Sequence, residues 1–295
     1  MYDVRKTYCA KTVHEALTYL SQEPGAVIVC GGTDVMIRMK ERKLREATLI
    51  SIMEVKELQG IRLDDNGDLL IGPATPFDTI YRDPLARKCV QMLADACNTV
   101  GSPQIRHVAT IGGNLCNGAV SADSVPSLLA LDAQLTLTSL EGERIVPVTE
   151  FHTGPGKTVL QKDRELLTCI RIPRENYENH GGRYIKFGQR NAMEISTLGC
   201  AVNCAMAADG TIRDFRIAYG VAASRPIRCP NAEKLMVGKK PTAELLHELR
   251  NAALAETNPR DSWRASKALR VQLIRELAER AATSAIEQAG GTIDA

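Results

Sequence analysis

The stretch VIVCGGTDV, Val27–Val35, decides how the first part of this chain folds. Its apolar residues predict a buried strand that ends at Gly31 and Gly32, directly before Thr33 and Asp34. Glycine permits positive φ angles and a close approach of backbone to a ligand. Successive amides ahead of a helix can bind an anion, to which Thr33 would add a hydroxyl, while Asp34 is expected to cap that helix. A tight turn without a ligand explains the same letters, so the motif alone is weak evidence.

A second glycine stretch, ATIGGNLCNGAVSAD at residues 109–123, repeats these features. It combines hydroxyl, glycine and amide groups at Thr110, Gly112, Gly113 and Asn114. Asp123 follows, where a carboxylate would accept hydrogen bonds from ribose or adenine. Neither stretch matches G-x-G-x-x-G or the P-loop pattern, which disfavours both of those folds. Two separate glycine pairs suit one extended pyrophosphate held between two subdomains, that is, a dinucleotide on a different scaffold.

Composition narrows the function classes. The chain has 295 residues, 44% hydrophobic and 24% charged, with a net charge of +2 and 4% aromatic residues. Such a balance gives no electrostatic or stacking basis for nucleic-acid or membrane binding. No apolar run reaches the roughly 20 residues of a membrane helix, and the first residues lack a signal-peptide pattern, so we expect a cytoplasmic protein.

The nine cysteines are expected to be free thiols, because an odd number without a secretion signal argues against a disulfide framework. Cys200 and Cys204 lie four residues apart in a strand-like run, which places both on one buried face. No C-x-x-C pair or metal-ligand spacing occurs, so we predict no metal site and no iron–sulfur cluster on this chain.

The hydrophobic periodicity predicts an α+β fold in two parts. Helices are expected after a capping box at Thr12–Glu15 and over residues 34–43, 76–100, 124–133, 242–256 and 266–288. Strands are expected at 26–30, 47–52, 61–63 and 69–71 (a hairpin with its turn at Asn66–Gly67), 135–148 (a second hairpin), 166–172, 184–187, 197–205 and 215–221. The polar, turn-rich residues 174–182 predict a domain boundary. We therefore expect one domain over residues 1–175, with lobes of about 1–55 and 56–175, and another over residues 182–295.

Three stretches together carry a family resemblance: VCGGTD, TIGGNLCNGAVSAD and YIKFGQRNAMEIS. They resemble the flavoprotein module of the molybdenum hydroxylases, the family of xanthine, carbon monoxide and nicotinate dehydrogenases. FHTGPGKT and SWRASKALR are similar to the separate FAD-binding subunits of bacterial xanthine dehydrogenases in particular. The resemblance covers essentially the whole chain. It implies a two-lobed FAD-binding domain of the vanillyl-alcohol-oxidase-like (PCMH) type, followed by a domain of a small antiparallel sheet plus helices.

The resemblance also implies which residues bind FAD. Gly31, Gly32 and Thr33 would hold the pyrophosphate, Asp123 would meet the adenosine half, and Leu167 would pack near the flavin or adenine. Lys186 would contact the isoalloxazine edge, where a cation could stabilise the reduced ring. The full predicted set is Val27, Ile28, Val29, Cys30, Gly31, Gly32, Thr33, Asp34, Ile105, Ala109, Thr110, Gly113, Asn114, Cys116, Asp123, Leu167 and Lys186. No residue is predicted to be catalytic, because the flavin would carry the chemistry.

The implied function is electron transfer in a heterotrimer, most plausibly a xanthine dehydrogenase. Partner chains would be a small subunit with two-iron two-sulfur clusters and a large subunit with the molybdenum cofactor, and NAD+ would be the acceptor. The alternatives are the FAD subunit of another N-heterocycle hydroxylase, such as nicotinate dehydrogenase, and a self-contained flavin oxidoreductase. A scaffold that binds flavin and partners without catalysis is a third. His152 could touch a partner or NAD, with a turn role for its segment as the alternative, and Trp263 is expected to be a packing anchor.

Overall fold

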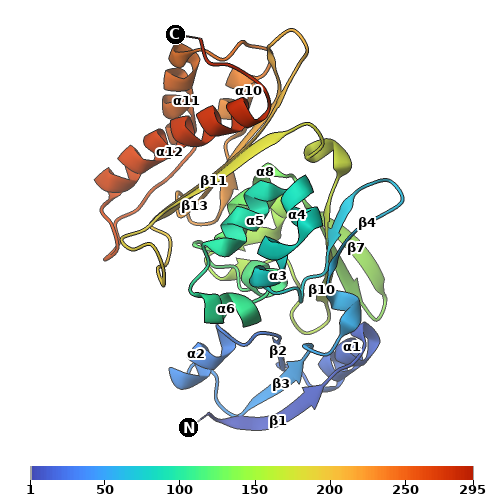
Figure 1. The fold of residues 1–295 in the computed structure, drawn as a ribbon. Helices are drawn as coiled ribbons and strands as arrows, with labels where there is room; N and C mark the ends of the chain where they lie inside the picture. The colour runs from blue at the N-terminus through green and yellow to red at the C-terminus, as the bar shows by residue number, and fades with distance from the viewer. Residues whose placement is uncertain (1, 295) are drawn as a thin grey trace.

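A small parallel sheet forms the first lobe of the structure, a computed structural model that describes residues 2–294 (Figure 1). Its strand order is β1–β3–β2. The elements are β1 (Val4–Cys9), α1 (Val13–Gln22), β2 (Val27–Val29), α2 (Val35–Lys40) and β3 (Ala47–Ser51). β2, α2 and β3 confirm the βαβ unit expected from the sequence. The sequence analysis misses β1, because its residues are largely polar and exposed and only pairing with β3 makes them a strand.

Helix α1 begins at the predicted capping box. The Thr12 hydroxyl accepts a hydrogen bond from the Glu15 amide at 3.1 Å. The Glu15 carboxylate accepts from the Lys11 amide at 2.8 Å, one residue before the usual partner of a capping box. The apolar stripe of the helix is buried. This stripe covers the parallel sheet and forms the core of the first lobe.

A five-stranded antiparallel sheet, in the order β4–β5–β10–β6–β7, forms the second lobe. Its strands are β4 (Ile61–Leu63), β5 (Leu69–Ile71), β6 (Gln134–Ser139), β7 (Gly142–Pro147) and β10 (Leu166–Ile172). The other elements of this lobe are η1 (Lys56–Leu58), α3 (Phe77–Arg82), α4 (Pro84–Cys89), α5 (Gln91–Asn98), α6 (Pro103–Val108), α7 (Ile111–Cys116), α8 (Ser124–Ala130), α9 (Val148–Phe151), β8 (His152–Gly154) and β9 (Lys157–Thr158). Both predicted hairpins are present.

The single helix predicted over residues 76–100 is wrong, because three helices fill this range. Pro84 has no amide to continue a helix, and Asp83 caps the next one by accepting from the amides of Leu85 and Ala86 at 2.9 Å each. α6 and α7 also lie within residues 101–123, where no helix was expected. Prolines and glycines near the starts of these short helices interrupt the helical sequence pattern, so their boundaries were not predicted.

Strand β10 joins the two lobes. Leu166 packs into the core of the first lobe, whereas its neighbour Leu167 packs into the core of the second, opposite Leu137. Alternate residues of a strand point to opposite faces, so one strand serves both cores. The lobes thus sit against each other on a shared strand, with the two glycine stretches near their junction.

The C-terminal region is a four-stranded antiparallel sheet with helices on one face (Figure 1). After η2 (Arg174–Asn176) come β11 (Gly181–Phe187), β12 (Leu198–Met206), β13 (Ile212–Gly220), β14 (Ile227–Arg228), α10 (Pro230–Met236), α11 (Ala243–Ala255) and α12 (Lys267–Gln288). Cys200 and Cys204 are buried free thiols on the helix-covered face, as predicted. Ala201 faces the other way and packs into the core of the second lobe. Along α12, Leu273, Leu277 and Ala281 are buried against this sheet, whereas Leu269 in the first turn is exposed.

The predicted division into domains, 1–175 and 182–295, remains a proposal. Two separate hydrophobic cores support it, one built on β5, β6 and β10 and the other on β12, β13 and α12. The sheet face of the C-terminal region is nevertheless shared with the second lobe, since α5 and α8 lie against β11, β12 and β13. The two parts are therefore expected to be stable as one body rather than as independent pieces.

Candidate functional site

The first glycine stretch lies where β2 turns into α2, and its two glycines have different physical roles. A Cβ on Gly31 would lie 1.7 Å from the carbonyl oxygen of Val108. Gly31 is therefore required by contact between the two lobes, and its contact with the pyrophosphate stays a prediction. Gly32 has φ +72°, and a Cβ there would lie 3.4 Å from the Met36 side chain. Its role is conformational, because only glycine adopts this backbone without strain.

This turn offers unused amides. No main-chain hydrogen bond among residues 2–294 uses the N–H groups of Gly32, Thr33 or Asp34. Asp34 occupies the position before α2 but makes no capping hydrogen bond, so the predicted cap is wrong. Its exposed side chain leaves the N-terminal amides of α2 open to a ligand. Free, adjacent amides at a positive-φ turn form the kind of concavity that binds phosphate oxygens.

The second glycine stretch is built differently, because protein groups already use its amides. The Gly112 amide donates to the Pro73 carbonyl at 2.8 Å, and a Cβ there would lie 2.5 Å from the Pro73 side chain. Thr110 caps α7 by accepting from the Gly113 amide at 3.3 Å. Asn114 accepts from the Ser124 hydroxyl at 2.7 Å through Oδ1. The second stretch therefore contributes shape and side-chain groups, whereas the first contributes free amides.

The fold brings the two glycine stretches together. A Cβ on Gly31 would meet both Val108 and the Ala109 amide nitrogen, and the Thr110 side chain lies close enough to the Cys30 thiol to affect its pKa. Burial raises the pKa of that thiol, with the Thr110 side chain opposing the shift, so Cys30 is an uncharged thiol at neutral pH. A single site between the lobes thus has residues 30–34 on one side and residues 108–114 on the other.

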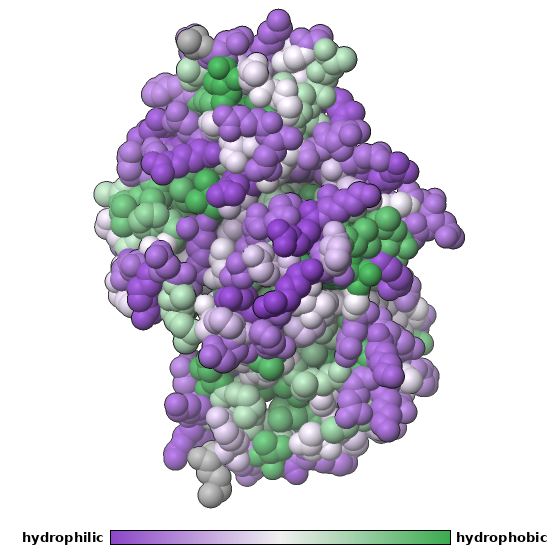
Figure 2. All heavy atoms as spheres, viewed as in Figure 1, coloured by the Kyte–Doolittle hydropathy of each residue, from purple (hydrophilic) through white to green (hydrophobic). Residues whose placement is uncertain are grey.

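Apolar side chains flank this site. Exposed Met36 and Ile37 lie on the first turn of α2, directly after the free amides, and exposed Val108 ends α6. Figure 2 shows a largely hydrophilic face on which apolar side chains gather at the lower end, over the first lobe. Free main-chain amides beside apolar surface suit a dinucleotide, whose phosphates accept hydrogen bonds from amides and whose rings are buried against apolar side chains.

Asp123 and Lys186 meet at a second position, between the second lobe and the C-terminal sheet. Asp123 is 7% exposed, and its Oδ2 accepts from Lys186 Nζ at 2.8 Å. Its Oδ1 accepts from the Tyr184 hydroxyl at 2.9 Å and from the Ser196 hydroxyl. The prediction that Asp123 meets the adenosine half and Lys186 the isoalloxazine edge separates two groups that form one ion pair. Both assignments stay predictions, to which the structure adds the ion pair.

The remaining predicted residues are dispersed. The β2 residues Val27, Ile28 and Val29 are half-buried between two small cores. Ile105 is half-buried beside Gly101, and Ala109 is buried with its carbonyl bonded to the Phe77 amide. Leu167 is buried in the core of the second lobe, so its contact with a cofactor ring stays a prediction. Burial raises the pKa of Cys116 to about 12, which keeps it a neutral thiol.

Two other predictions concern single residues outside this set. His152 is buried, and its Nε2 contacts the Leu115 carbonyl at 3.1 Å, so it is not available to a partner or to NAD. Trp263 is 82% exposed and stacks on the Arg264 guanidinium, so it is not a packing anchor. The hairpin around Gly156 packs on the end of α7, which explains the burial of His152.

Sequence reasoning missed Tyr184 and Ser196 as members of the Asp123 network. Tyr184 lies two residues before Lys186 on β11, and period-two alternation places both on the same face of the sheet. That signal was present in the letters YIK. Ser196 has no such signal, because it lies in the irregular segment between β11 and β12.

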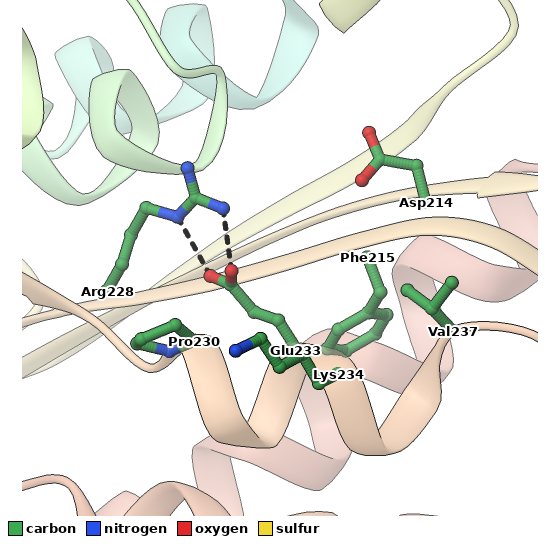
Figure 3. A pocket seen from close by; sticks show the side chains of 7 residues that line it. All are labelled: Asp214, Phe215, Arg228, Pro230, Glu233, Lys234 and Val237. Atoms are coloured by element: carbon green, nitrogen blue, oxygen red, sulfur yellow. Dashed lines mark hydrogen bonds and ion pairs between the residues drawn. The ribbon is translucent and has the colours of Figure 1, made fainter.

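Hollows of about 400 Å³ and 390 Å³ lie on the C-terminal region, away from both glycine stretches. In the first, the Arg228 guanidinium faces the Glu233 carboxylate in a two-point ion pair of 2.9 Å and 2.6 Å (Figure 3). Arg228 also donates to Asp132 of the second lobe at 3.0 Å. These charges satisfy one another and join the two parts of the chain. We therefore place the candidate site at the free amides rather than at these hollows.

Comparison with known proteins decides the family. Residues 3–175 match the family model described as the FAD binding domain in molybdopterin dehydrogenase, and residues 183–285 match the CO dehydrogenase flavoprotein C-terminal domain. The chain belongs to this flavoprotein family. It is 39% identical over 293 residues to the putative xanthine dehydrogenase FAD-binding subunit XdhB of Escherichia coli (strain K12), covering 99% of this chain and 100% of that one.

Other relatives extend the family likeness. The nicotinate dehydrogenase FAD-subunit of Eubacterium barkeri is 32% identical over 244 residues, with 81% of each chain covered. A solved structure of carbon monoxide dehydrogenase from Hydrogenophaga pseudoflava matches with a TM-score of 0.92 at 27% identity, covering 98% of this chain and 99% of that one. The predicted α+β, two-lobed FAD-binding fold is thereby confirmed.

Two kinds of feature are absent from residues 2–294. No helix in this range combines the length and the apolar character needed to cross a membrane. No group of three or more His, Cys, Asp or Glu side chains in the same range is placed to hold a metal ion.

Proposed function

We propose that this chain is the FAD-binding, electron-transfer subunit of a molybdenum hydroxylase, with xanthine dehydrogenase as the favoured enzyme. The free amides of Gly32, Thr33 and Asp34 at a positive-φ turn carry the proposal, because they supply the donors that a pyrophosphate needs. The residues present fit FAD, since exposed apolar side chains lie beside those donors. The family match over residues 3–175 supports the same cofactor.

FAD, when bound, would accept electrons and hand them on as a hydride. The chain's own residues would bind and orient it. The amides of residues 32–34 would donate to phosphate oxygens, and the Thr33 hydroxyl would add a donor. Thr110 would hold the start of α7, and Gly31 would keep the two lobes in contact around the cofactor. No side chain of this chain is assigned a proton-transfer role.

The proposed partners are a small chain with two-iron two-sulfur clusters and a large chain with the molybdenum cofactor, in the cytoplasm. The relatives named as subunits and chains of xanthine, nicotinate and carbon monoxide dehydrogenases support this assembly. NAD+ is proposed as the acceptor. Substrate would bind the large chain, so the 32% identity to a nicotinate dehydrogenase FAD-subunit keeps a hydroxylase for another N-heterocycle as the second candidate.

The test uses the complex purified through a tag on this chain. Xanthine, hypoxanthine and nicotinate are added separately under anaerobic conditions while flavin absorbance is followed. Bleaching by a purine, and its reversal by NAD+, supports the favoured enzyme. Bleaching by nicotinate alone selects the second candidate, and reversal by a ferredoxin but not by NAD+ overturns the proposed acceptor. A tagged chain that reacts with a small substrate without partners overturns the subunit role.

A further inference from the structure

The Asp123 carboxylate lies between two parts of the chain, and both of its oxygens accept hydrogen bonds from side chains of the protein. It belongs to the second lobe, directly before α8. All three side-chain donors that bind it come from the C-terminal region: Tyr184 at 2.9 Å, Lys186 at 2.8 Å, and Ser196. Burial beside Asp123 raises the pKa of Tyr184 far above its ordinary value, so Tyr184 stays a phenol that donates.

The ammonium of Lys186 is equally committed. An ammonium has three N–H donors. Besides Asp123, its Nζ contacts the carbonyl oxygens of Thr99 and Glu194, each at 2.9 Å. All three donors are therefore used within the protein. A hydrogen bond from this group to the isoalloxazine edge, which the family resemblance implies, would require one of these contacts to break.

The same contacts fix the segment 188–196 that links β11 to β12. Glu194 is held through its carbonyl and Ser196 through its hydroxyl, while the Met193 amide donates to the Gly101 carbonyl at 3.0 Å. A Cβ on Gly199 would lie 2.8 Å from the Tyr184 hydroxyl, so a glycine there gives Tyr184 its place. The segment is thus tied directly to the second lobe through Met193 and Ser196, and indirectly through Lys186, which binds both Glu194 and Asp123.

We propose that Asp123, Tyr184, Lys186 and Ser196 form an interdomain clamp that holds segment 188–196 against the second lobe. Tyr184 is in this account a positioning residue, not a ligand of the cofactor. Lys186 and Asp123 present a neutral pair of charges rather than a free cation. The clamp itself rests on the contacts above, and only its effect on FAD rests on the proposed function.

Hydrogen exchange on the full chain without flavin tests the clamp directly. Tyr184→Phe removes one hydrogen bond to a carboxylate, a loss of about 1.5 kcal/mol or roughly tenfold in an opening equilibrium. We expect amides in segment 188–196 to exchange about tenfold faster. The matched control is Tyr81→Phe, since the half-buried Tyr81 side chain makes no hydrogen bond within residues 2–294. Unchanged exchange in Tyr184→Phe overturns the clamp.

Charge removal distinguishes a clamp from a free cation. Asp123→Asn and Lys186→Gln are each expected to speed exchange of the segment and to shift the flavin midpoint potential, because each leaves one buried charge uncompensated. The double variant is expected to return both readouts toward the wild-type values. A potential in the double variant equal to that of Lys186→Gln alone shows a cation acting on the flavin and overturns the clamp. A wild-type chain that holds no flavin refutes the proposed function, while the exchange measurement still decides the clamp.

Discussion

The contact between Gly31 and Val108 makes a sharp prediction for Gly31→Ala. The added methyl would lie 1.7 Å from the Val108 carbonyl oxygen, whereas the closest favourable carbon–oxygen contacts are about 3.3 Å. The turn must therefore move by roughly 1.6 Å relative to α6. That displacement separates the two lobes at the candidate site and moves the free amides away from their positions. Both stability and flavin binding should suffer.

Two other glycines calibrate the size of this effect. Gly25 has φ +78° with no atom within 4 Å of a built Cβ, and Gly32 has φ +72° with only van der Waals contacts. Alanine at either position should cost about 1–2 kcal/mol of backbone strain. Overpacking at Gly31 should cost about 3 kcal/mol or more, because a backbone carbonyl cannot rotate away as a side chain can. Loss of two amide–phosphate hydrogen bonds should make the free energy of flavin binding about 3 kcal/mol less favourable, which raises Kd roughly 150-fold.

The assay combines urea unfolding of the flavin-free chain with flavin titration of all three variants. We expect Gly25→Ala and Gly32→Ala to lower the free energy of unfolding by similar amounts. Of these two variants, only Gly32→Ala should bind flavin more weakly. Gly31→Ala should be the least stable of the three and should bind flavin at least tenfold more weakly than wild type. Gly32→Val, with a larger side chain at the turn, should hold no flavin after desalting. A Gly31→Ala chain as stable as Gly25→Ala, with full flavin occupancy, would refute the reasoning.

Three further predictions address other parts of the molecule. Burial lowers the pKa of His152 below its ordinary 6.5, so the stability contributed by the neutral ring is complete above about pH 6.5 and is lost as the pH falls below it. In urea unfolding at several pH values, His152→Gln should make this loss of stability smaller. The surface variant His107→Gln should leave the loss unchanged. Arg270 is buried and donates to main-chain carbonyls rather than to a carboxylate. In urea unfolding, Arg270→Ala should therefore lower the free energy of unfolding by about 3 kcal/mol. The control Arg280→Ala, at an exposed residue, should lower it by less than about 0.5 kcal/mol. Trp263→Ser should leave the free energy of unfolding within about 0.5 kcal/mol of wild type, and a loss above about 2 kcal/mol would restore the packing role that the structure denies it.

Local sequence signals predicted the elements whose cause is local. The capping box at Thr12, the turn at Asn66–Gly67 and the alternation at Cys200 and Cys204 each determine conformation within a few residues. The strand at Val4–Cys9 escaped prediction because its pairing with β3, about forty residues later, supplies the stabilisation. Pro84 was missed as a helix boundary because the apolar stripe around it has helical periodicity on both sides.

The candidate site shows the same limit. The sequence predicted that two glycine stretches act together, and the structure brings them into contact through Gly31 and Val108. The sequence could not show that Gly31 permits close contact between the lobes while Gly32 permits a positive φ angle, because both residues are glycine. Nor could it show that Asp123 and Lys186, 63 residues apart, form one ion pair, because only tertiary packing sets that distance.

The central claim is that this chain binds FAD by itself, through the amides that follow β2. The most direct measurement is the visible absorption spectrum of the purified chain, recorded after FAD is added and the sample is desalted. The account predicts flavin bands that survive desalting at about one flavin per chain. A demonstrably folded chain that retains no flavin on its own would contradict the account.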